Sequence, residues 1–395
     1  MVSDPELARE VFAADPAFLD PLRVLADLFG PASVLGTSGP LHKRQRKLLN
    51  PRFHGSRVKA LLGVIDRAVS ERLADFGKAA AQGDIIAMAE FAQALTLDVI
   101  LETTFGASAG LDRAASRRVL MRLIQGLSPV FVFAAALRSP VFPPWRAFTR
   151  RRAEFDIWVD TLVAPRRQSG VLGDDILGML LEATYDDGSS MGDDEIRDQL
   201  MTLLLAGHET TAVALAWGVY WLLREPTVLA RLRSEIDGLG PCPGVEAVAR
   251  LPYLGAVISE TLRIEPVVTD VSRVCRKPLA LGPWHVPEGE LALVNVSALL
   301  ANDALFPEPR RFRPQRFLER SYNASEFMPF GGGHRRCLGA AFAEAELAIA
   351  LAAIASKWDL ELATKEPERA VRRNITMGPK NMVQVRVVGK RATVQ

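Results

Sequence analysis

One cysteine stands in a setting that suits a metal-bound thiolate. The sequence FGGGHRRCLG places Cys337 after three glycines and two arginines. Glycines allow a tight turn with positive φ angles and the close approach of a ligand. The Ala- and Leu-rich run 340–355 is typical of a helix, so free backbone N–H groups should lower the pKa of the thiol. Such a thiolate can bind haem iron, and Arg335 could meet a haem propionate. The alternative is a buried structural cysteine beside a glycine turn.

A carboxylic acid and an alcohol stand side by side in a second stretch. The sequence LLLAGHETT places Glu209 directly before Thr210, and together they could relay protons. On a helix, the Thr210 hydroxyl can bond the carbonyl of Ala206, and the small pair Ala206–Gly207 lets a flat ligand approach. The alternative is a buried helix whose threonines only satisfy their own hydrogen bonds. A zinc site of the H-E-x-x-H kind is excluded, because Ala212 stands where the second histidine is needed.

Two further pairs of polar residues have helical spacing. His42 and Arg46 are four apart in a basic run, so they share a helix face that either is solvated or holds anionic groups. Glu260 and Arg263 are three apart in an apolar helix that starts at a proline. An E-x-x-R pair can be an ordinary surface pair. Three other pairs match the same pattern: Glu6–Arg9, Glu308–Arg311 and Glu366–Arg369.

The elements that would position these residues are mostly helices. Helical periodicity covers residues 5–14, 41–49, 57–76, 85–105, 114–127, 145–163, 193–224, 226–239 and 252–263. Short strand-like runs occur at residues 271–275, 279–281, 291–296, 358–363, 371–377 and 382–388. Residues 15–39 and 301–317 are predicted to be irregular. The expected fold is therefore mostly α with small β-sheets.

The composition places the chain among ordinary globular proteins. It has 395 residues, 49% of them hydrophobic and 24% charged, and no Pro-, Gly- or Ser-rich linker divides it, so a single domain over residues 1–395 is expected. The net charge of +2 gives no argument for a nucleic-acid partner, and none is expected. A polar N-terminus, no long apolar run and three cysteines without paired spacing predict a cytoplasmic protein without a membrane span.

These stretches together resemble the cytochromes P450, in chain order. Phe330, Gly333, Cys337 and Gly339 fit the signature F-x-x-G-x-x-x-C-x-G, with an arginine two residues before the cysteine. Residues 206–211 match A-G-x-[DE]-T-[TS], and the basic helix is similar to the H-x-x-x-R helix of the family. The sequence FRPQRF resembles the P-E-R-F segment and contains Arg316, although Gln315 departs from the common glutamate.

The resemblance implies a cytochrome P450 fold and a role for each matched residue. Cys337 would bind the iron of haem b, Glu209 and Thr210 would deliver protons, and an apolar segment at residues 130–145 would form a lid over the substrate. Three residues would support the cysteine loop: Glu260, Arg263 and Arg316. The haem or its propionates would be contacted by His42, Arg46, Ala206, Gly207, Arg273, Phe330, Gly333, Arg335 and Gly339. From the residues alone, Arg273 is equally an arginine at a strand edge.

The resemblance also implies a reaction. A soluble, probable monomer of bacterial type would activate O2 to hydroxylate or epoxidise an apolar small molecule. Electrons would come singly from a ferredoxin or flavodoxin with its reductase, because the chain has no dinucleotide fingerprint or flavin domain. The exposed charges of the basic helix (Lys43, Arg44 and Lys47) would face an acidic redox partner. The alternatives are a peroxide-driven peroxygenase and a non-catalytic haem-binding protein or fragment.

One departure concerns the start of the chain. The basic helix begins near residue 41, earlier than in most members of the family. The first helix and the first two strands of the usual sheet are therefore expected to be missing. Their absence would leave one edge of that sheet exposed.

Overall fold

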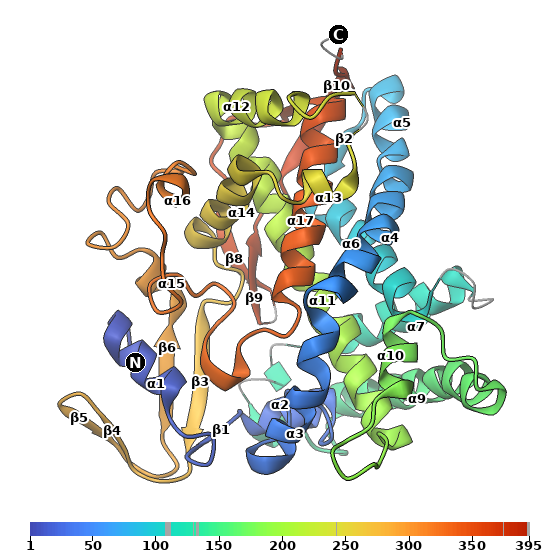
Figure 1. Ribbon diagram of the computed structural model, residues 1–395, viewed down its shortest axis with the longest axis vertical. Coiled ribbons are helices and arrows are strands. Elements are labelled where there is room, and N and C mark those ends of the chain that lie inside the picture. Colours follow the sequence, from blue (N-terminus) through green and yellow to red (C-terminus); the bar gives the residue numbers. More distant parts are fainter. Residues whose placement is uncertain (107–111, 129, 132–133, 242, 374, 393–395) are drawn as a thin grey trace.

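Helices make up most of the protein, and small antiparallel sheets lie among and beside them (Figure 1). The computed structural model describes residues 1–106, 112–128, 130–131, 134–241, 243–373 and 375–392. Its helices are α1 (Pro5–Ala13), α2 (Arg23–Phe29), α3 (Gly39–Leu49), α4 (Ser56–Arg72), α5 (Ala74–Gln82), α6 (Met88–Phe105), α7 (Arg113–Gly126), α9 (Pro143–Ser169), α10 (Ile176–Glu182), α11 (Asp193–Arg224), α12 (Pro226–Asp237), α13 (Val245–Val248), α14 (Pro252–Ile264), α15 (Val296–Leu300), α16 (Arg316–Glu319) and α17 (Ala340–Lys357). The prediction of a mostly helical protein is confirmed.

The long helix α11 runs through the main hydrophobic core. Acidic residues occupy its first turn, where the helix dipole favours negative charge. Its sides pack against α6 and α17, and most of its side chains from Ile196 to Leu222 are buried. Within the described residues, α11 is also the one helix that is long and apolar enough to cross a membrane. However, 72% of its most apolar window is buried inside the protein, as expected of a core helix.

Most predicted helices are present, with several differences. The predicted helix 57–76 is broken at Leu73 into α4 and α5, and the first residues of the predicted helix 85–105 form the strand β2 (Ile85–Ala87). The segment expected to be irregular, 15–39, contains β1 (Leu19–Asp20) and α2. The short helices α10, α13, α15 and α16 were not predicted. α1 begins as predicted, because the Asp4 carboxylate caps it by accepting hydrogen bonds from the N–H groups of Glu6 and Leu7 at 2.9 and 3.0 Å.

The strands form four small antiparallel sheets. Their order is β1-β3-β6, β2-β10-β7, β4-β5 and β8-β9. The predicted strand 371–377 is in fact a hairpin, and β5 was missed. The strands are β1 (Leu19–Asp20), β2 (Ile85–Ala87), β3 (Asp270–Cys275), β4 (Leu279–Leu281), β5 (Trp284–Val286), β6 (Leu291–Asn295), β7 (Trp358–Leu362), β8 (Ala370–Arg373), β9 (Thr376–Pro379) and β10 (Gln384–Lys390).

The N-terminal segment covers part of the sheet edge that was expected to be exposed. Val2 forms a parallel bridge with Val294 of β6, and its N–H donates to the carbonyl of Leu293 at 2.7 Å. Val2 is buried in a second hydrophobic cluster that joins α1 to β3, β4 and β6. The expectation of an exposed edge is therefore wrong at this point, because backbone pairing and apolar burial both occur there.

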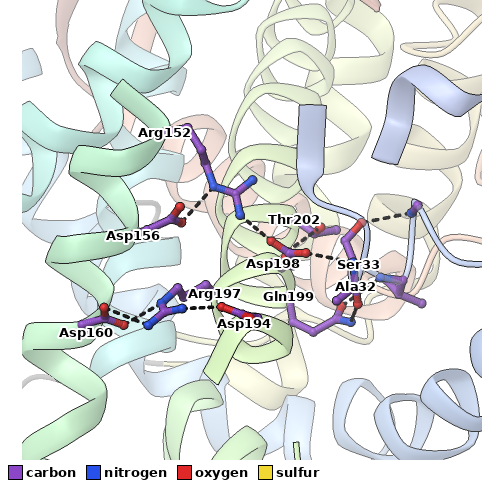
Figure 2. A network of polar contacts seen from close by, with 12 residues as sticks. Ala32, Ser33, Arg152, Asp156, Asp160, Asp194, Arg197, Asp198, Gln199 and Thr202 are labelled. Atoms are coloured by element: carbon purple, nitrogen blue, oxygen red, sulfur yellow. Dashed lines mark hydrogen bonds and ion pairs between the residues drawn. The ribbon is translucent and has the colours of Figure 1, made fainter. Parts of the chain in front are cut away.

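A polar network fixes the connection between α2 and α3 onto α11. Figure 2 shows the buried carboxylate of Asp198 between Arg152 of α9, which bonds it, and the N–H of Ala32, which donates at 2.9 Å. The next residue on α11, Gln199, accepts from Val34 N–H at 3.1 Å and donates to the carbonyl of Ala32 at 3.0 Å. These contacts join α9, α11 and residues 32–34, which lie just before the basic helix α3.

Candidate functional site

The glycines of the cysteine loop are required by its geometry. Gly331 and Gly333 have φ angles of 67° and 66°, which side chains rarely adopt. A Cβ on Gly333 would lie 2.0 Å from the carbonyl oxygen of Phe12 at the end of α1. The N–H of Cys337 donates to the carbonyl of Phe330 at 3.0 Å and closes the loop. The positive φ angles were predicted, but the close approach at Gly333 is to α1.

Cys337 combines an accessible side chain with a desolvated thiol. The side chain is exposed, yet the surrounding protein raises the pKa of the thiol. The Gly339 N–H, Arg46 and Arg336 act in the opposite direction. The predicted net lowering of the pKa is therefore wrong for the protein without a metal, because desolvation outweighs these three groups. A bound iron ion would supply the charge that keeps the sulfur deprotonated.

A cluster of cationic residues lies beside the cysteine. Burial, together with electrostatic interactions with Arg335, His334, Arg46 and Arg273, lowers the pKa of His42 to about 3, so its imidazole is neutral near pH 7. The His42 and His334 rings are in edge contact, with centroids 5.6 Å apart. Arg46 also interacts electrostatically with Cys337, so the cluster and the cysteine belong to one site. His334 was not singled out from the sequence.

The arginines of this cluster have no carboxylate partner in the described part of the chain. Burial lowers the pKa values of Arg273 and Arg335 to about 10, and none of Arg46, Arg273 and Arg335 forms an ion pair with Asp or Glu there. The buried Nε atoms of Arg46 and Arg335 lack a hydrogen-bond partner. Because buried charge is costly unless it is paired, this cluster fits a group with two carboxylates, such as the propionates of haem.

The acid–alcohol pair lies on α11 at a locally accessible turn. The Thr210 hydroxyl donates to the carbonyl of Ala206 at 2.7 Å, as predicted. Ala206 is exposed although most of α11 is buried, so this face could receive a flat ligand. A Cβ on Gly207 would lie 3.3 Å from the side chain of Ile100, so this glycine lets α6 approach α11. The predicted haem contacts of Ala206 and Gly207 stay predictions.

His208 anchors this turn of α11 to α6 from the buried side. Its Nε2–H donates to the carbonyl of Gln93 at 3.0 Å, and the Thr96 hydroxyl donates to the carbonyl of His208 at 3.0 Å. Burial lowers the pKa of His208 to about 4, so the ring is neutral near pH 7. The sequence indicated only that His208 is not a zinc ligand; its packing against a helix about a hundred residues earlier could not be read from spacing.

The carboxylate of Glu209 is contacted from the C-terminal hairpin. Thr376 of β9 is buried, and its hydroxyl lies 3.0 Å from Glu209 Oε1. This contact could not be predicted from the sequence, because the two residues are 167 positions apart and Thr376 belongs to no motif. The structure therefore adds Thr376 to the residues predicted around the acid–alcohol pair.

The predicted support for the cysteine loop is a buried ionic network. Arg263 donates from Nε and Nη2 to the two oxygens of Glu260 at 2.7 and 2.9 Å, and Arg316 Nε donates to the same carboxylate at 3.1 Å. The N–H of Arg313 is a fourth donor at 2.8 Å. All three charged side chains are at most 2% exposed, which excludes the surface-pair interpretation. By contrast, the Glu6–Arg9 pair is exposed.

Two charges of the basic helix α3 form ion pairs at the surface of the protein. Arg44 pairs with Asp187 at 2.9 Å and lies over the ring of Tyr185, and Lys47 pairs with Asp186 at 2.8 Å. Lys43 is exposed on the same helix, and Arg44 and Lys47 also remain exposed. That these charges face a redox partner stays a prediction.

The comparisons with known proteins agree on one family. The sequence profile of the family described as Cytochrome P450 matches residues 1–385. Cytochrome P450 138 of Mycobacterium tuberculosis is 34% identical over 391 residues, which cover 96% of this chain and 84% of the relative. Cytochrome P450 135B1 of the same species is 35% identical over 394 residues, covering 98% and 81%. The chain belongs to the cytochrome P450 family.

Solved structures show the same fold. The haem domain of cytochrome P450DA has a TM-score of 0.86 at 25% identity, covering 98% of this chain and 87% of its own. The cyanobacterial CYP120A1, solved with retinoic acid bound, has a TM-score of 0.84 at 25% identity, covering 96% and 86%. The cytochrome P450 fold is thus confirmed. Family members are haem-thiolate proteins that bind haem b, and the accessible cysteine with its unpaired cations fits that group.

Proposed function

We propose that this protein is a haem-thiolate monooxygenase acting on an apolar small molecule. In that reaction, the substrate, O2, two electrons and two protons give an oxygenated product and one water molecule. The observation that carries the proposal is the buried cation cluster at His42, which lacks carboxylate partners among the described residues and is coupled through Arg46 to the accessible Cys337. Family membership supports an oxidoreductase, and the acid–alcohol pair on α11 supports the use of O2.

The residues of the chain would divide the work as follows. Haem b, when bound, supplies iron chemistry that binds and reduces O2. Cys337 would bind its iron, and His42, Arg46, Arg273 and Arg335 would hold its propionates. The cost of burying the charges of the three arginines would then be offset by the anions they bind. These four assignments all rest on one cluster in the structure.

Two side chains on α11 would handle the protons. Because the Thr210 hydroxyl donates its hydrogen to Ala206, its oxygen remains able to accept a hydrogen bond from a water molecule. Glu209 can release a proton at its carboxyl oxygen and take up another. The pair would therefore move protons from the protein interior to the accessible turn of α11.

Substrate and electron donors follow from the family rather than from single contacts. P450 enzymes generally use separate redox partners, so we propose a ferredoxin or flavodoxin with its reductase, docking where Lys43 and Arg336 are exposed. The proposed cytoplasmic location fits two cysteines, Cys275 and Cys337, that are free.

A solved relative binds retinoic acid, which agrees with an apolar substrate class. In the described part of the proposed lid, residues 130–145, Phe131 and Trp145 pack together and against Phe148 of α9, and residues 132–133 lie outside the description.

An isotope experiment tests the reaction class. The haem-loaded protein, with a ferredoxin and its reductase, is given NADPH, ¹⁸O2 and a panel of fatty acids, terpenes, steroids and polyketides. The proposal predicts a product with one ¹⁸O atom, and unlabelled product from ordinary O2 in labelled water. Turnover only with added hydrogen peroxide would instead indicate a peroxygenase. Bound haem that accepts electrons but oxidises no member of the panel would indicate a non-catalytic haem protein.

A further inference from the structure

The contact between Thr376 and Glu209 joins two elements that are packed tightly together. β9 lies along α11, and a Cβ on Gly378 would lie only 3.5 Å from the side chain of Val213. On its other side, β9 is held by the Met377 N–H, which donates to the carbonyl of Val267 at 2.8 Å. Thr376 itself is 1% exposed. Its hydroxyl is therefore fixed beside the Glu209 carboxyl by backbone packing.

The Thr376 hydroxyl has two possible acceptors and a single hydrogen. It lies 3.0 Å from Glu209 Oε1 and 2.8 Å from the carbonyl of Arg373. When Glu209 is ionised, the hydroxyl can donate to the carboxylate. When Glu209 is protonated, the carboxylic acid can donate to the Thr376 oxygen while the hydroxyl donates to Arg373. Both protonation states of Glu209 thus keep a hydrogen bond to Thr376, with only a hydroxyl rotation between them.

We propose that Thr376 is a positioning residue that holds the Glu209 carboxyl in place while it loses and regains a proton. The inference rests on the proposed function, since it concerns proton delivery during O2 reduction. A threonine that only supported β9 would be satisfied by the Arg373 carbonyl alone, which is a common local pattern. The second contact, to the one acid on the accessible turn of α11, is what a purely structural role does not require.

The experiment compares the haem-loaded wild type with Thr376→Val, Thr376→Ser, Glu209→Gln and the double variant Thr376→Val/Glu209→Gln. The readout is NADPH-driven O2 consumption with a ferredoxin and its reductase, measured in H2O and D2O. This reduction of O2 to hydrogen peroxide or water takes up protons and needs no identified substrate. Thr376→Val should slow it by about tenfold, as loss of an outer-shell partner does. Thr376→Ser should restore the rate and the solvent isotope effect.

Coupling between the two residues gives the sharper comparison. In the Glu209→Gln background, Thr376→Val should change O2 consumption by less than about twofold, because both changes interrupt the same step. The effects of Thr376→Val and Glu209→Gln on the free energy of unfolding should also be non-additive in the double variant. This comparison tests the contact without catalysis. Peroxide-driven oxidation of guaiacol should be nearly unchanged in Thr376→Val, since hydrogen peroxide already carries two protons. If Thr376→Val does not take up haem, Thr376→Ala takes its place.

Thr103→Val is the matched control. Thr103 is equally buried and donates to a backbone carbonyl at 2.7 Å, but it contacts no acid on α11. It should lose stability without a change in solvent isotope effect. A wild-type rate and isotope effect in Thr376→Val, or additive effects with Glu209→Gln, would overturn the inference while leaving the proposed function intact. A wild type that binds haem but consumes no O2 would instead contradict the proposed function itself.

Discussion

Two regions of this protein bury positive charge in opposite ways. Around Glu260, the side chains of Arg263 and Arg316 are almost fully buried and both bond the same carboxylate. Around His42, the arginines 46, 273 and 335 are also largely buried, but they have no Asp or Glu partner in the described residues. The first region has a carboxylate partner within the chain, whereas the second would gain its carboxylates from a bound group such as haem. The presence of a carboxylate partner therefore distinguishes the two regions, although arginines build both.

The largest expected effect comes from removing the carboxylate that Arg263 and Arg316 share. Glu260→Gln leaves two buried arginines without their carboxylate, and loss of one partner of a buried ion pair costs about 3–5 kcal/mol. We expect the free energy of unfolding, measured by chemical denaturation, to fall by that amount. The matched control is Glu308→Gln, which removes an exposed E-x-x-R pair and should change stability by less than about 0.5 kcal/mol. Equal effects in the two variants would show that the Glu260 network is not a special support.

Removing a charge from the cluster around His42 should weaken haem binding but leave the stability of the haem-free protein about unchanged. Arg335→Met removes a buried charge that has no ion-pair partner among the described residues, but it also removes the hydrogen bond to the carbonyl of Thr37, so the haem-free protein should be about as stable as the wild type. The haem-loaded protein should bind haem about tenfold or more weakly, since a hydrogen bond to a charged group contributes about 1.5–3 kcal/mol. Haem transfer to an acceptor protein measures the affinity. A loss of stability in the haem-free variant would contradict the assignment.

The pH dependence of the free energy of unfolding tests whether His42 is buried within the cationic cluster. Burial lowers the pKa of His42 in the folded protein to about 3, against the ordinary histidine value of 6.5, so the unfolded chain binds the proton more strongly. The contribution of His42 to the free energy of unfolding is therefore fully present above pH 6.5. It decreases as the pH falls toward 3, by roughly 2 kcal/mol at pH 5. In the haem-free protein, His42→Asn should lose less stability than the wild type between pH 7 and pH 5. Parallel unfolding curves would show that His42 is not desolvated.

The smallest effect is expected at the surface pairs of α3. Lys47→Ala removes an exposed pair with Asp186, and such pairs contribute about 0–1 kcal/mol. Because Lys47 is already occupied by Asp186, the variant should leave the KM for ferredoxin almost unchanged in steady-state assays. Lys43→Ala should raise that KM more, since Lys43 is exposed. A larger effect of Lys47→Ala than of Lys43→Ala would show that the pair with Asp186 does not keep Lys47 from contacting the redox partner.

The sequence predicted those features that lie within one element or one loop. The bond from Thr210 to Ala206, the positive φ angles of Gly331 and Gly333, and the pairing of Glu260 with Arg263 follow from spacing and from the family pattern. Thr376 could not be predicted, because it reaches Glu209 only when β9 packs on α11.

Two electrostatic features could not be predicted from the sequence, and they share a cause. The occupied state of Arg44 and Lys47 depends on a turn more than a hundred residues away. The raised pKa of the Cys337 thiol depends on desolvation by surrounding chain segments. Both are balances among tertiary neighbours, and spacing along the sequence carries no information about them.

The most direct test of the account is the reduced carbon monoxide difference spectrum of the haem-loaded protein and of Cys337→Ala. A thiolate ligand predicts a band near 450 nm in the wild type that is absent from the variant. Arg335→Met should keep the position of this band and lose only occupancy, because it acts on the propionates. A band near 450 nm that persisted in Cys337→Ala would show that this cysteine does not bind the iron.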